Sequence, residues 1–393
     1  MLRPVLAAAA LAFAAAAVVV TAGSQAVAAN RTSGCLTSFD PAADYFPGKA
    51  AIEDAVNFRV EYRKSYKVVT VREAFAGGPA ERYLLVQCGA PLPRGESASA
   101  IVTVPITSLF AGSTTHLAPL VDLGRVDVLS GVSRLRDLTG DEIVRRASTG
   151  HVSEFAPSSV IDAELVVSRQ PSVLMSGGSP LASLSVIRAA GIPVVANTEW
   201  LESTALARAE WLKYVALFLN EEREAQTHYA ALKARYRALS ARARAASPKP
   251  LVMTGRSTNG TFVIAGGRSY VAALIADAGG RYVWAENASA GAPSVDLEAQ
   301  VRRASAADIW INGGGWPSLA QMRQDEPRYP AFKAYRDGQV WVYERRLTPT
   351  GRNDYWMRST SRPDLVLADL IKIFHPSLLP DHTFEWYMRV PPR

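Results

Sequence analysis

Arginine and aromatic side chains recur in the second half of the chain, in loops that follow short apolar runs. Arginine presents planar, charged N–H donors to carboxylate, hydroxamate or catecholate oxygens, while tryptophan and tyrosine supply a large apolar wall with a polar edge. Side chains of these types would suit a pocket for a bulky anionic metal chelate. The candidate ligand-binding residues of this half are Arg256, Ser257, Arg268, Trp316, Arg345, Tyr355 and Trp356.

A smaller set of polar residues lies in the corresponding loops of the first half. In open α/β sheets, ligands bind beyond the carboxyl ends of the strands, and that rule selects these loops. We therefore predict that both sets face one cleft. The candidates of the first half are Thr115, His116, Arg134, His151 and Ser176.

The five histidines do not have the spacing of a metal site. None is placed at a metal-ligand interval from another histidine or from a cysteine, whereas a bare-metal binder needs three or four convergent donors. We expect no metal bound by the protein alone and no cofactor. His116 and His151 are expected to contact a ligand as single pocket residues.

Motifs of catalysis and of nucleic-acid binding are also lacking in the sequence. There is no Gly-x-Ser-x-Gly elbow, and Gly313-Gly314-Gly315 has no Lys-Ser/Thr of a phosphate loop. The formal net charge of +7 is spread out, and its densest part lies on one helix without interleaved aromatic residues. We therefore predict no catalytic residues and no nucleic-acid partner.

One long helix is predicted between the two halves, over residues 221–248. Its apolar stripe alternates spacings of four and three residues, Asn220 is the expected N-cap, and Ser247-Pro248 stops it. A helix of roughly 26 residues spans about 39 Å, more than one small lobe requires. The stripe consists of Ala225, Tyr229, Leu232, Tyr236, Leu239 and Ala243.

Strands alternate with helices on both sides of this linker, as in parallel β–α units. The first such strand is expected at 101–104, and one helix is expected over 203–219. The fold class is therefore α/β: two Rossmann-like α/β lobes joined by a single long helix, with an N-terminal β-rich extension. The expected divisions are a signal peptide at 1–28, the extension at 29–95, the N-terminal lobe at 96–220, the linker helix at 221–248 and the C-terminal lobe at 249–393.

The N-terminal residues have the features of an export signal. Arg3 precedes an apolar stretch, and Ala26-Val27-Ala28 offers a cleavage site. An exported chain with two cysteines is expected to form one disulfide, Cys35–Cys88. The competing interpretation is a lipid on Cys35, because Thr32-Ser33-Gly34-Cys35 resembles a lipobox. We predict a periplasmic monomer, and favour the disulfide over the lipid anchor.

Three features together resemble a known family. Each half carries an Asp-x-Glu helix start before a strand, at Asp162 and at Asp296; the linker helix lies between them; and 264–271 reads Ile-Ala-Gly-Gly-Arg-Ser-Tyr-Val before Gly279-Gly280. In this order and spacing, residues 97–385 resemble the periplasmic substrate-binding proteins of ABC importers for ferric siderophores, haem and cobalamin.

The resemblance implies a function and a partner. It implies capture of an iron–siderophore-type chelate between the lobes and delivery to the transmembrane dimer of an ABC permease. In that family, acidic residues at the positions of Glu164 and Glu298 pair with permease arginines, and both are present here. The alternatives are a cobalamin, corrinoid or haem ligand and, from another class, an exported metal-chelatase-like enzyme on the same fold.

Overall fold

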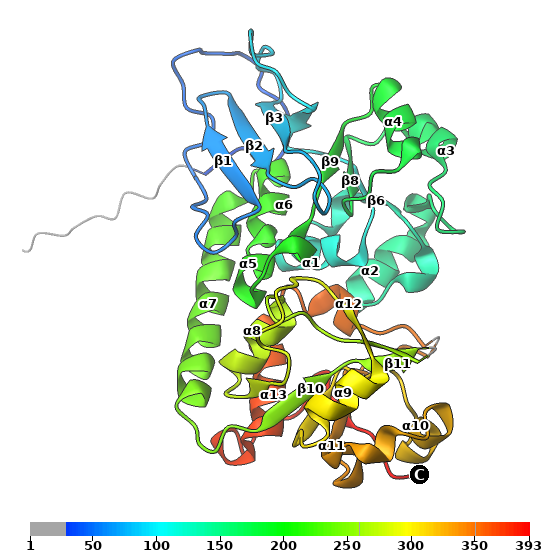
Figure 1. The fold of residues 1–393 in the computed structure, drawn as a ribbon. Helices are drawn as coiled ribbons and strands as arrows, with labels where there is room; N and C mark the ends of the chain where they lie inside the picture. The colour runs from blue at the N-terminus through cyan, green and yellow to red at the C-terminus, as the bar shows by residue number, and fades with distance from the viewer. Residues whose placement is uncertain (1–28, 259, 350) are drawn as a thin grey trace, which may run out of the picture.

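The computed structural model describes residues 29–258, 260–349 and 351–393; the predicted signal peptide lies outside this range. Two α/β lobes are stacked along one long helix, with the N-terminal lobe uppermost in Figure 1. This confirms the predicted fold class. Within the described residues, none of the helices combines the length and hydropathy that a bilayer span requires.

The N-terminal lobe is built on a five-stranded parallel sheet of order β7-β6-β5-β8-β9. Because all five strands run the same way, their carboxyl ends share one edge. The strands are β5 (Leu109–Ala111), β6 (Leu129–Val132), β7 (Ser153–Glu154), β8 (Val173–Ser176) and β9 (Val194–Ala196). The connecting helices are α1 (Ala118–Asp122), α2 (Asp141–Arg146), α3 (Ala163–Arg169) and α4 (Ala182–Ala189).

The C-terminal lobe repeats this plan. Its sheet has the order β13-β10-β15-β16-β17, parallel except for the last strand. The strands are β10 (Leu251–Thr254), β13 (Arg281–Tyr282), β15 (Ile309–Ile311), β16 (Val340–Val342) and β17 (Met388–Arg389). The helices are α8 (Tyr270–Asp277), α9 (Leu297–Ala304), α10 (Leu319–Asp325), α11 (Lys333–Arg336), α12 (Tyr355–Arg358) and α13 (Pro363–Phe374). A small antiparallel sheet joins β11 (Arg256–Thr258), β12 (Thr261–Val263) and β14 (Ser294–Asp296).

The predicted linker is α7 (Glu222–Arg244), which runs beside both lobes in Figure 1. Its apolar stripe faces inward: Ala225, Tyr229 and Leu232 are buried, as are Tyr236 and Ala243. The predicted cap is wrong, because Asn220 ends the preceding helix in the left-handed conformation, with φ 60°. The single helix expected over 203–219 is two, α5 (Ala205–Ala209) and α6 (Trp211–Leu219).

The N-terminal extension is a four-stranded sheet packed on α6. Its strands are β1 (Phe58–Tyr62), β2 (Tyr66–Val71), β3 (Glu81–Gln87) and β4 (Ala100–Val104). The sequence assigned 101–104 to the N-terminal lobe, and this is wrong: β4 pairs in parallel with β3, and β5 lies at the centre of the lobe's sheet. The predicted Cys35–Cys88 disulfide is present.

Candidate ligand-binding cleft

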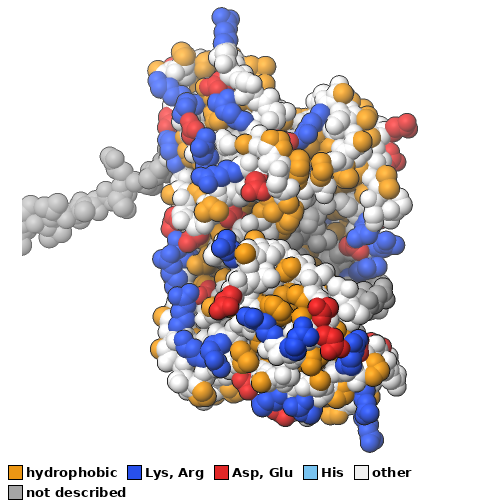
Figure 2. Space-filling model, viewed as in Figure 1, with side chains coloured by type: hydrophobic (Ala, Val, Ile, Leu, Met, Phe, Trp, Pro, Cys, Tyr) orange, Lys and Arg blue, Asp and Glu red, His pale blue; other side chains and the backbone are white. Residues whose placement is uncertain are grey.

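A cavity of about 460 Å³ lies between the lobes. Loops at the carboxyl ends of β5 and β6 form one wall, and residues 351–357 of the other lobe form the opposite wall. Figure 2 shows the surface hollowed between the upper and lower lobes. Met357 of α12 is buried in the hydrophobic core of the N-terminal lobe, so this short helix joins the two lobes next to the cavity.

Hydroxyl groups line the N-terminal wall. Ser113 caps the short helical turn Thr114–His116, since its Oγ accepts from the Thr115 backbone N–H. Ser133 Oγ donates to the Gly112 carbonyl at 3.0 Å, which ties the loop after β6 to the loop after β5. Because both loops follow strands of the same sheet, the sheet fixes the positions of these hydroxyl groups.

Asp137 connects charges from the two lobes at the cavity. It forms an ion pair with Arg134 of its own lobe and a second, at 3.3 Å, with Arg352 of the C-terminal lobe. All three line the cavity. With two guanidinium groups and one carboxylate, the wall keeps an excess of one positive charge, which favours an anionic group in the cavity.

The C-terminal wall rests on stacked aromatic rings. Tyr343 and Tyr355 stack with their centroids 4.4 Å apart, and Trp356 meets Tyr343 edge-on at 5.2 Å. Tyr355 is buried, whereas Trp356 lines the cavity and is 50% exposed. Trp356 is therefore the aromatic surface available to a ligand, and Tyr355 supports it from behind.

The carboxyl ends of three neighbouring strands of the C-terminal sheet carry a second group of polar residues. Arg256 follows β10, the bend Gly313–Gly315 follows β15, and Glu344 follows β16. Burial raises the pKa of the Glu344 carboxyl above its ordinary value, and the charge of Arg256 opposes that rise.

Of the predicted ligand-binding residues, the structure brings Arg134 and Trp356 to the cavity. Thr115 lies in the turn at its edge. His116, next to it, is only 1% exposed, and burial lowers the pKa of its imidazole to about 4. His116 is therefore a neutral side chain beneath the wall, and it does not line the cavity.

The remaining predicted residues lie elsewhere. His151 precedes β7, at the sheet edge away from the cleft, and Trp316 packs in the core against Trp310 and Tyr329, with both ring distances at 5.7 Å. Arg345 is exposed, and its backbone N–H donates to the Trp386 carbonyl.

Ser176, Ser257 and Arg268 are also separate from this cavity. Ser176 lines a cavity of about 320 Å³ beside the extension, and Arg268 lies in an open depression along α8. The backbone N–H of Ser257 donates to the Tyr329 hydroxyl at 2.9 Å.

The two proposed docking residues occupy matching places. Asp162 and Asp296 each cap a helix, accepting from Leu165 N and Ala299 N. Glu164 and Glu298 follow two residues later, and both are exposed. Glu298 lies 3.5 Å from Arg328.

Sequence reasoning missed Asp137, Glu344, Arg352 and Asn353. Glu344 could have been found, because it follows the short apolar run of β16 (Val340–Val342) and so lies at the carboxyl edge of the sheet. Arg352 and Asn353 precede a four-residue helix that has no recognisable periodicity, so only the tertiary fold brings them to the cavity. Asp137 lies in a short turn, and its carboxylate pairs with Arg352, more than two hundred positions away. No local pattern in the sequence indicates this pair.

Comparisons with known proteins agree with this architecture. The family model described as periplasmic binding protein matches residues 128–347. An uncharacterized lipoprotein of Methanocaldococcus jannaschii is 22% identical over 334 residues, which cover 81% of this chain and 78% of the relative. A second lipoprotein of that organism is 24% identical over 246 residues, covering 60% of each.

Solved structures resemble the chain at the level of fold. The periplasmic haem-binding protein RhuT of Roseiflexus sp. RS-1 aligns with a TM-score of 0.53 and 19% identity, covering 69% of this chain and 99% of the other. The Helicobacter pylori CeuE complex with nickel and histidine aligns with a TM-score of 0.56 and 13% identity, covering 80% of this chain and 90% of the other.

Proposed function

The chain belongs to the periplasmic binding protein family, and from that premise we propose that it is the substrate-binding protein of an ABC importer. In this proposal it captures an iron–siderophore-type chelate between its lobes and delivers the chelate to a permease. The family and the matched structures are solute-binding proteins, which agrees with a binding protein rather than an enzyme.

The cavity between the lobes is the observation that supports this ligand class. Arg134 and Arg352 approach it from opposite lobes, and Trp356 offers an exposed ring. In a ferric siderophore the chelator already fills the metal's coordination sphere, so the protein needs only to bind the outer oxygens and the apolar surface. Arginine and tryptophan supply both contacts.

Haem is the second candidate, because three matched structures are described as periplasmic haem-binding proteins. Proteins commonly hold haem iron through a histidine, cysteine, methionine or tyrosine side chain. The described residues that line the cavity include no histidine, cysteine or tyrosine, and their one methionine, Met357, is 2% exposed. The lining therefore favours a chelate that brings its own complete set of ligands.

A fluorescence titration tests the ligand. A ferric trihydroxamate, a ferric tricatecholate, haemin and cyanocobalamin are each added to the purified protein. We expect a ferric siderophore to quench tryptophan emission, through Trp356, at micromolar concentration or below. Arg352→Ala should weaken binding by roughly tenfold to a hundredfold if its contact is a charged hydrogen bond. Arg59→Ala, an exposed change in the extension, is the matched control.

The titration has clear contrary outcomes. Saturable binding of haemin or cyanocobalamin alone would replace the siderophore proposal with the corresponding alternative. Unchanged siderophore affinity in both Arg352→Ala and Trp356→Ala would show that the ligand binds elsewhere.

We further propose that Glu164 and Glu298 dock on the permease. Their support is their exposure on equivalent helices of the two lobes, since a pseudo-twofold protein can present one acid to each subunit of a permease dimer. Glu164→Arg combined with Glu298→Arg should leave ligand affinity unchanged and abolish uptake. Transport at the wild-type level with normal expression would contradict this role.

The proposed location is the periplasm, with the protein as a monomer. A disulfide between Cys35 and Cys88 suits an oxidising compartment outside the cytoplasm. Mass spectrometry of the mature protein without reductant should detect no free thiol and no lipid on Cys35. Two alkylatable cysteines would contradict the pairing.

A further inference from the structure

Three neighbouring strands bring two opposite charges to one bend of the C-terminal lobe. In the sheet, β15 lies between β10 and β16. The bend Gly313–Gly315, which follows β15, therefore lies between Arg256, which follows β10, and Glu344, which follows β16. All three segments leave the sheet at its carboxyl edge, where α/β proteins bind ligands.

The glycines of this bend leave room for both side chains. A Cβ on Gly314 would lie 3.0 Å from Cδ and Nη1 of Arg256, and a Cβ on Gly315 would lie 2.5 Å from Oε1 of Glu344. Gly314 also has φ +105°, a conformation that other residues rarely adopt. The guanidinium and the carboxylate thus both rest against bare backbone.

The two charges share the bend without being paired. No hydrogen bond or ion pair joins either side chain to another residue in the described part of the chain, although each acts on the other electrostatically. Arg256 is exposed and Glu344 is half-buried. The oxygens of Glu344 are not among the fully buried unpartnered atoms of the described residues, so water reaches this carboxylate, and a donor on a ligand would replace that water.

One aromatic group connects this bend to the cavity. Tyr343 precedes Glu344 in the chain, and its ring packs on Trp356, which lines the cavity. A chelate seated against Trp356 can therefore extend an arm along the C-terminal wall toward Arg256 and Glu344.

We propose that Arg256 and Glu344 form a subsite for a neutral ligand arm that carries a hydrogen-bond donor next to an acceptor oxygen, as a secondary amide does. Arg256 donates to the carbonyl oxygen, and Glu344 accepts from the N–H. A carboxylate arm satisfies Arg256 but is repelled by Glu344. The inference rests on the proposed function, and it narrows the substrate class to chelates with amide-bearing arms.

The test compares two ferric chelates: a trihydroxamate whose linkers contain secondary amides, and ferric citrate, whose free arms are carboxylates. We expect Glu344→Ala to weaken binding of the trihydroxamate about tenfold, and to leave binding of ferric citrate unchanged or tighter. Glu344→Gln, which keeps an acceptor oxygen and the side-chain volume, should retain the trihydroxamate within about threefold and bind citrate more tightly. Arg256→Ala should weaken binding of both chelates.

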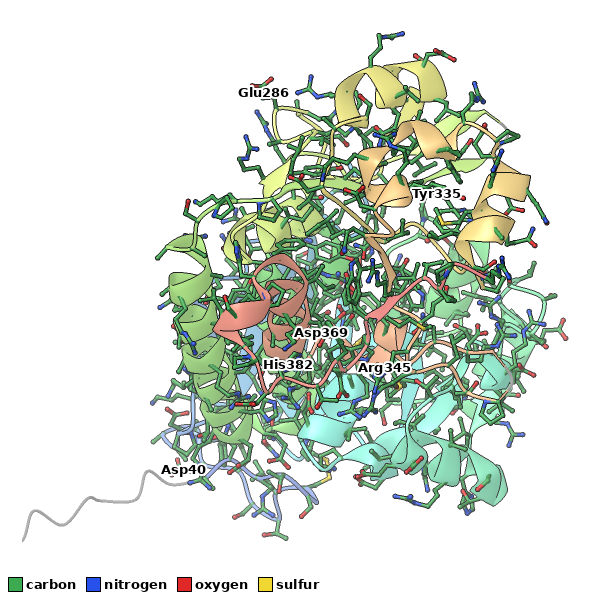
Figure 3. The ribbon with its side chains drawn as sticks, turned by 90° about the horizontal axis from the view of Figure 1, so that it is seen from below. Asp40, Glu286, Tyr335, Arg345, Asp369 and His382 are labelled. Atoms are coloured by element: carbon green, nitrogen blue, oxygen red, sulfur yellow. A yellow bond between two sulfur atoms is a disulfide. The ribbon has the colours of Figure 1, made fainter. Side chains whose placement is uncertain are left out.

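Glu286→Ala is the matched control, because Glu286 is an exposed acid of the same lobe and Figure 3 shows it far from Arg345, the neighbour of Glu344. Equal trihydroxamate affinity in Glu344→Ala and wild type would overturn the subsite while the proposed function stands. An equal loss of affinity for the trihydroxamate and for ferric citrate in Glu344→Ala would also overturn the subsite. If the wild type does not bind the trihydroxamate, the subsite fails, and the proposed function fails as well if the ferric tricatecholate also does not bind.

Discussion

The N-terminal extension and the C-terminal tail, residues 375–393 after α13, are attached to the two lobes in the same way. In each case a buried carboxylate accepts consecutive backbone N–H groups. Glu210 accepts from the N–H groups of residues 53, 54 and 55. Asp369 of α13 accepts from those of residues 385, 386 and 387. Each carboxylate is fully buried, so each replaces its lost hydration with backbone donors.

The side chains that contact the two buried carboxylates differ. Glu210 pairs at 2.7 Å with Lys213, and both side chains are fully buried. Asp369 has His382 as its neighbour, with Nε2 at 2.6 Å and the imidazole 16% exposed. Figure 3 shows Asp369 and His382 side by side, from α13 and from the tail. The first anchor is thus closed to water, while the second remains near the surface.

The two segments also differ in what they support. None of the described residues that line the inter-lobe cavity comes from the extension. Instead, Lys67 of the extension binds the end of α6 and the start of α7 through hydrogen bonds. The tail packs beneath the cleft: Tyr387 donates to Asn312 at 2.6 Å and lies against Tyr343 and Tyr355. We infer that the extension mainly stabilises the fold and that the tail mainly holds the geometry of the binding site.

The largest expected effect concerns Lys67, whose ammonium is fully buried and donates to Glu222, Asn220 and the Leu217 carbonyl. Lys67→Met leaves Glu222 buried without its counterion, which should lower the free energy of unfolding by about 3–5 kcal/mol. Chemical denaturation measures this change. Ligand affinity of the folded fraction should not change.

Two variants control this experiment. The double variant Lys67→Met with Glu222→Gln removes both charges and should recover most of the loss. Lys64→Ala, at an exposed position of the same hairpin, should be neutral. A weakened affinity in Lys67→Met would contradict the separation of stability from binding.

Loss of the disulfide is expected to have the second-largest effect on stability. It joins residues 53 positions apart, and closing a loop of that length stabilises by roughly 3–4 kcal/mol in the chain-entropy model. Cys35→Ser with Cys88→Ser should lower the melting temperature and leave ligand affinity unchanged. The comparison with reduced wild type separates the lost cross-link from the changed side chains, and agreement between the two samples is expected.

Asp369→Asn should lower the free energy of unfolding by less than loss of the disulfide does, but it should weaken ligand binding. The amide keeps an acceptor oxygen but loses the charge, so we expect about 1–3 kcal/mol of destabilisation. The tail then loosens beneath Tyr343 and Tyr355, and the dissociation constant of the ligand should rise several-fold. Denaturation and titration of the same preparation test both. A purely structural anchor would lower stability while leaving the dissociation constant as in the wild type.

Tyr387→Phe removes one hydrogen bond, that to Asn312 at the carboxyl end of β15. The expected loss of stability is about 0.5–1.5 kcal/mol, with a rise in the dissociation constant. Tyr335→Phe, which removes a hydrogen bond to the Leu319 carbonyl on the same lobe, is the control. Equal dissociation constants for Tyr387→Phe and Tyr335→Phe would contradict a role of the tail in the binding site.

The smallest effect is a dependence on pH at the extension. The hydrogen bond from Lys233 lowers the pKa of Glu53 from 4.5 to about 2. Because the folded-state pKa is depressed, this contact stabilises above pH 4.5 and is lost as pH falls toward 2. Glu53 is 40% exposed, so its contribution is below about 1 kcal/mol.

The stability difference between wild type and Glu53→Gln measures this contact. It should be present at pH 7 and vanish near pH 2. A difference that persists at pH 2 would assign the effect to packing rather than charge.

The elements with strong local signals could be predicted from the sequence. The alternating stripe from Ala225 to Ala243 identified α7, and Asp162 and Asp296 identified the starts of α3 and α9. Strand pairing could not be predicted this way, because β4 has the same apolar pattern whether it joins the lobe or the extension. The short strand β5 carries only three residues and gave no periodicity.

The binding-site residues were likewise predictable where a local signal marks them and not where only the tertiary fold brings them together. Arg134 was found because it follows an apolar run at β6, and Trp356 because a large aromatic side chain suits the wall of a pocket. Trp316 was misplaced because an exposed and a buried tryptophan have the same sequence signature after a glycine run. Arg352 depends on its distant partner Asp137, and an interaction between lobes leaves no trace in local composition.

The buried partner of Lys67 has a consequence for the order in which the chain folds. If the protein crosses a membrane N-terminus first, as the signal peptide predicts, residue 67 arrives 155 positions before Glu222. Until then Lys67 lacks the carboxylate that compensates its burial, whereas Cys35 and Cys88 can already pair. Contacts of such long range form late. The extension is thus the first of the described parts to emerge and among the last to be completed.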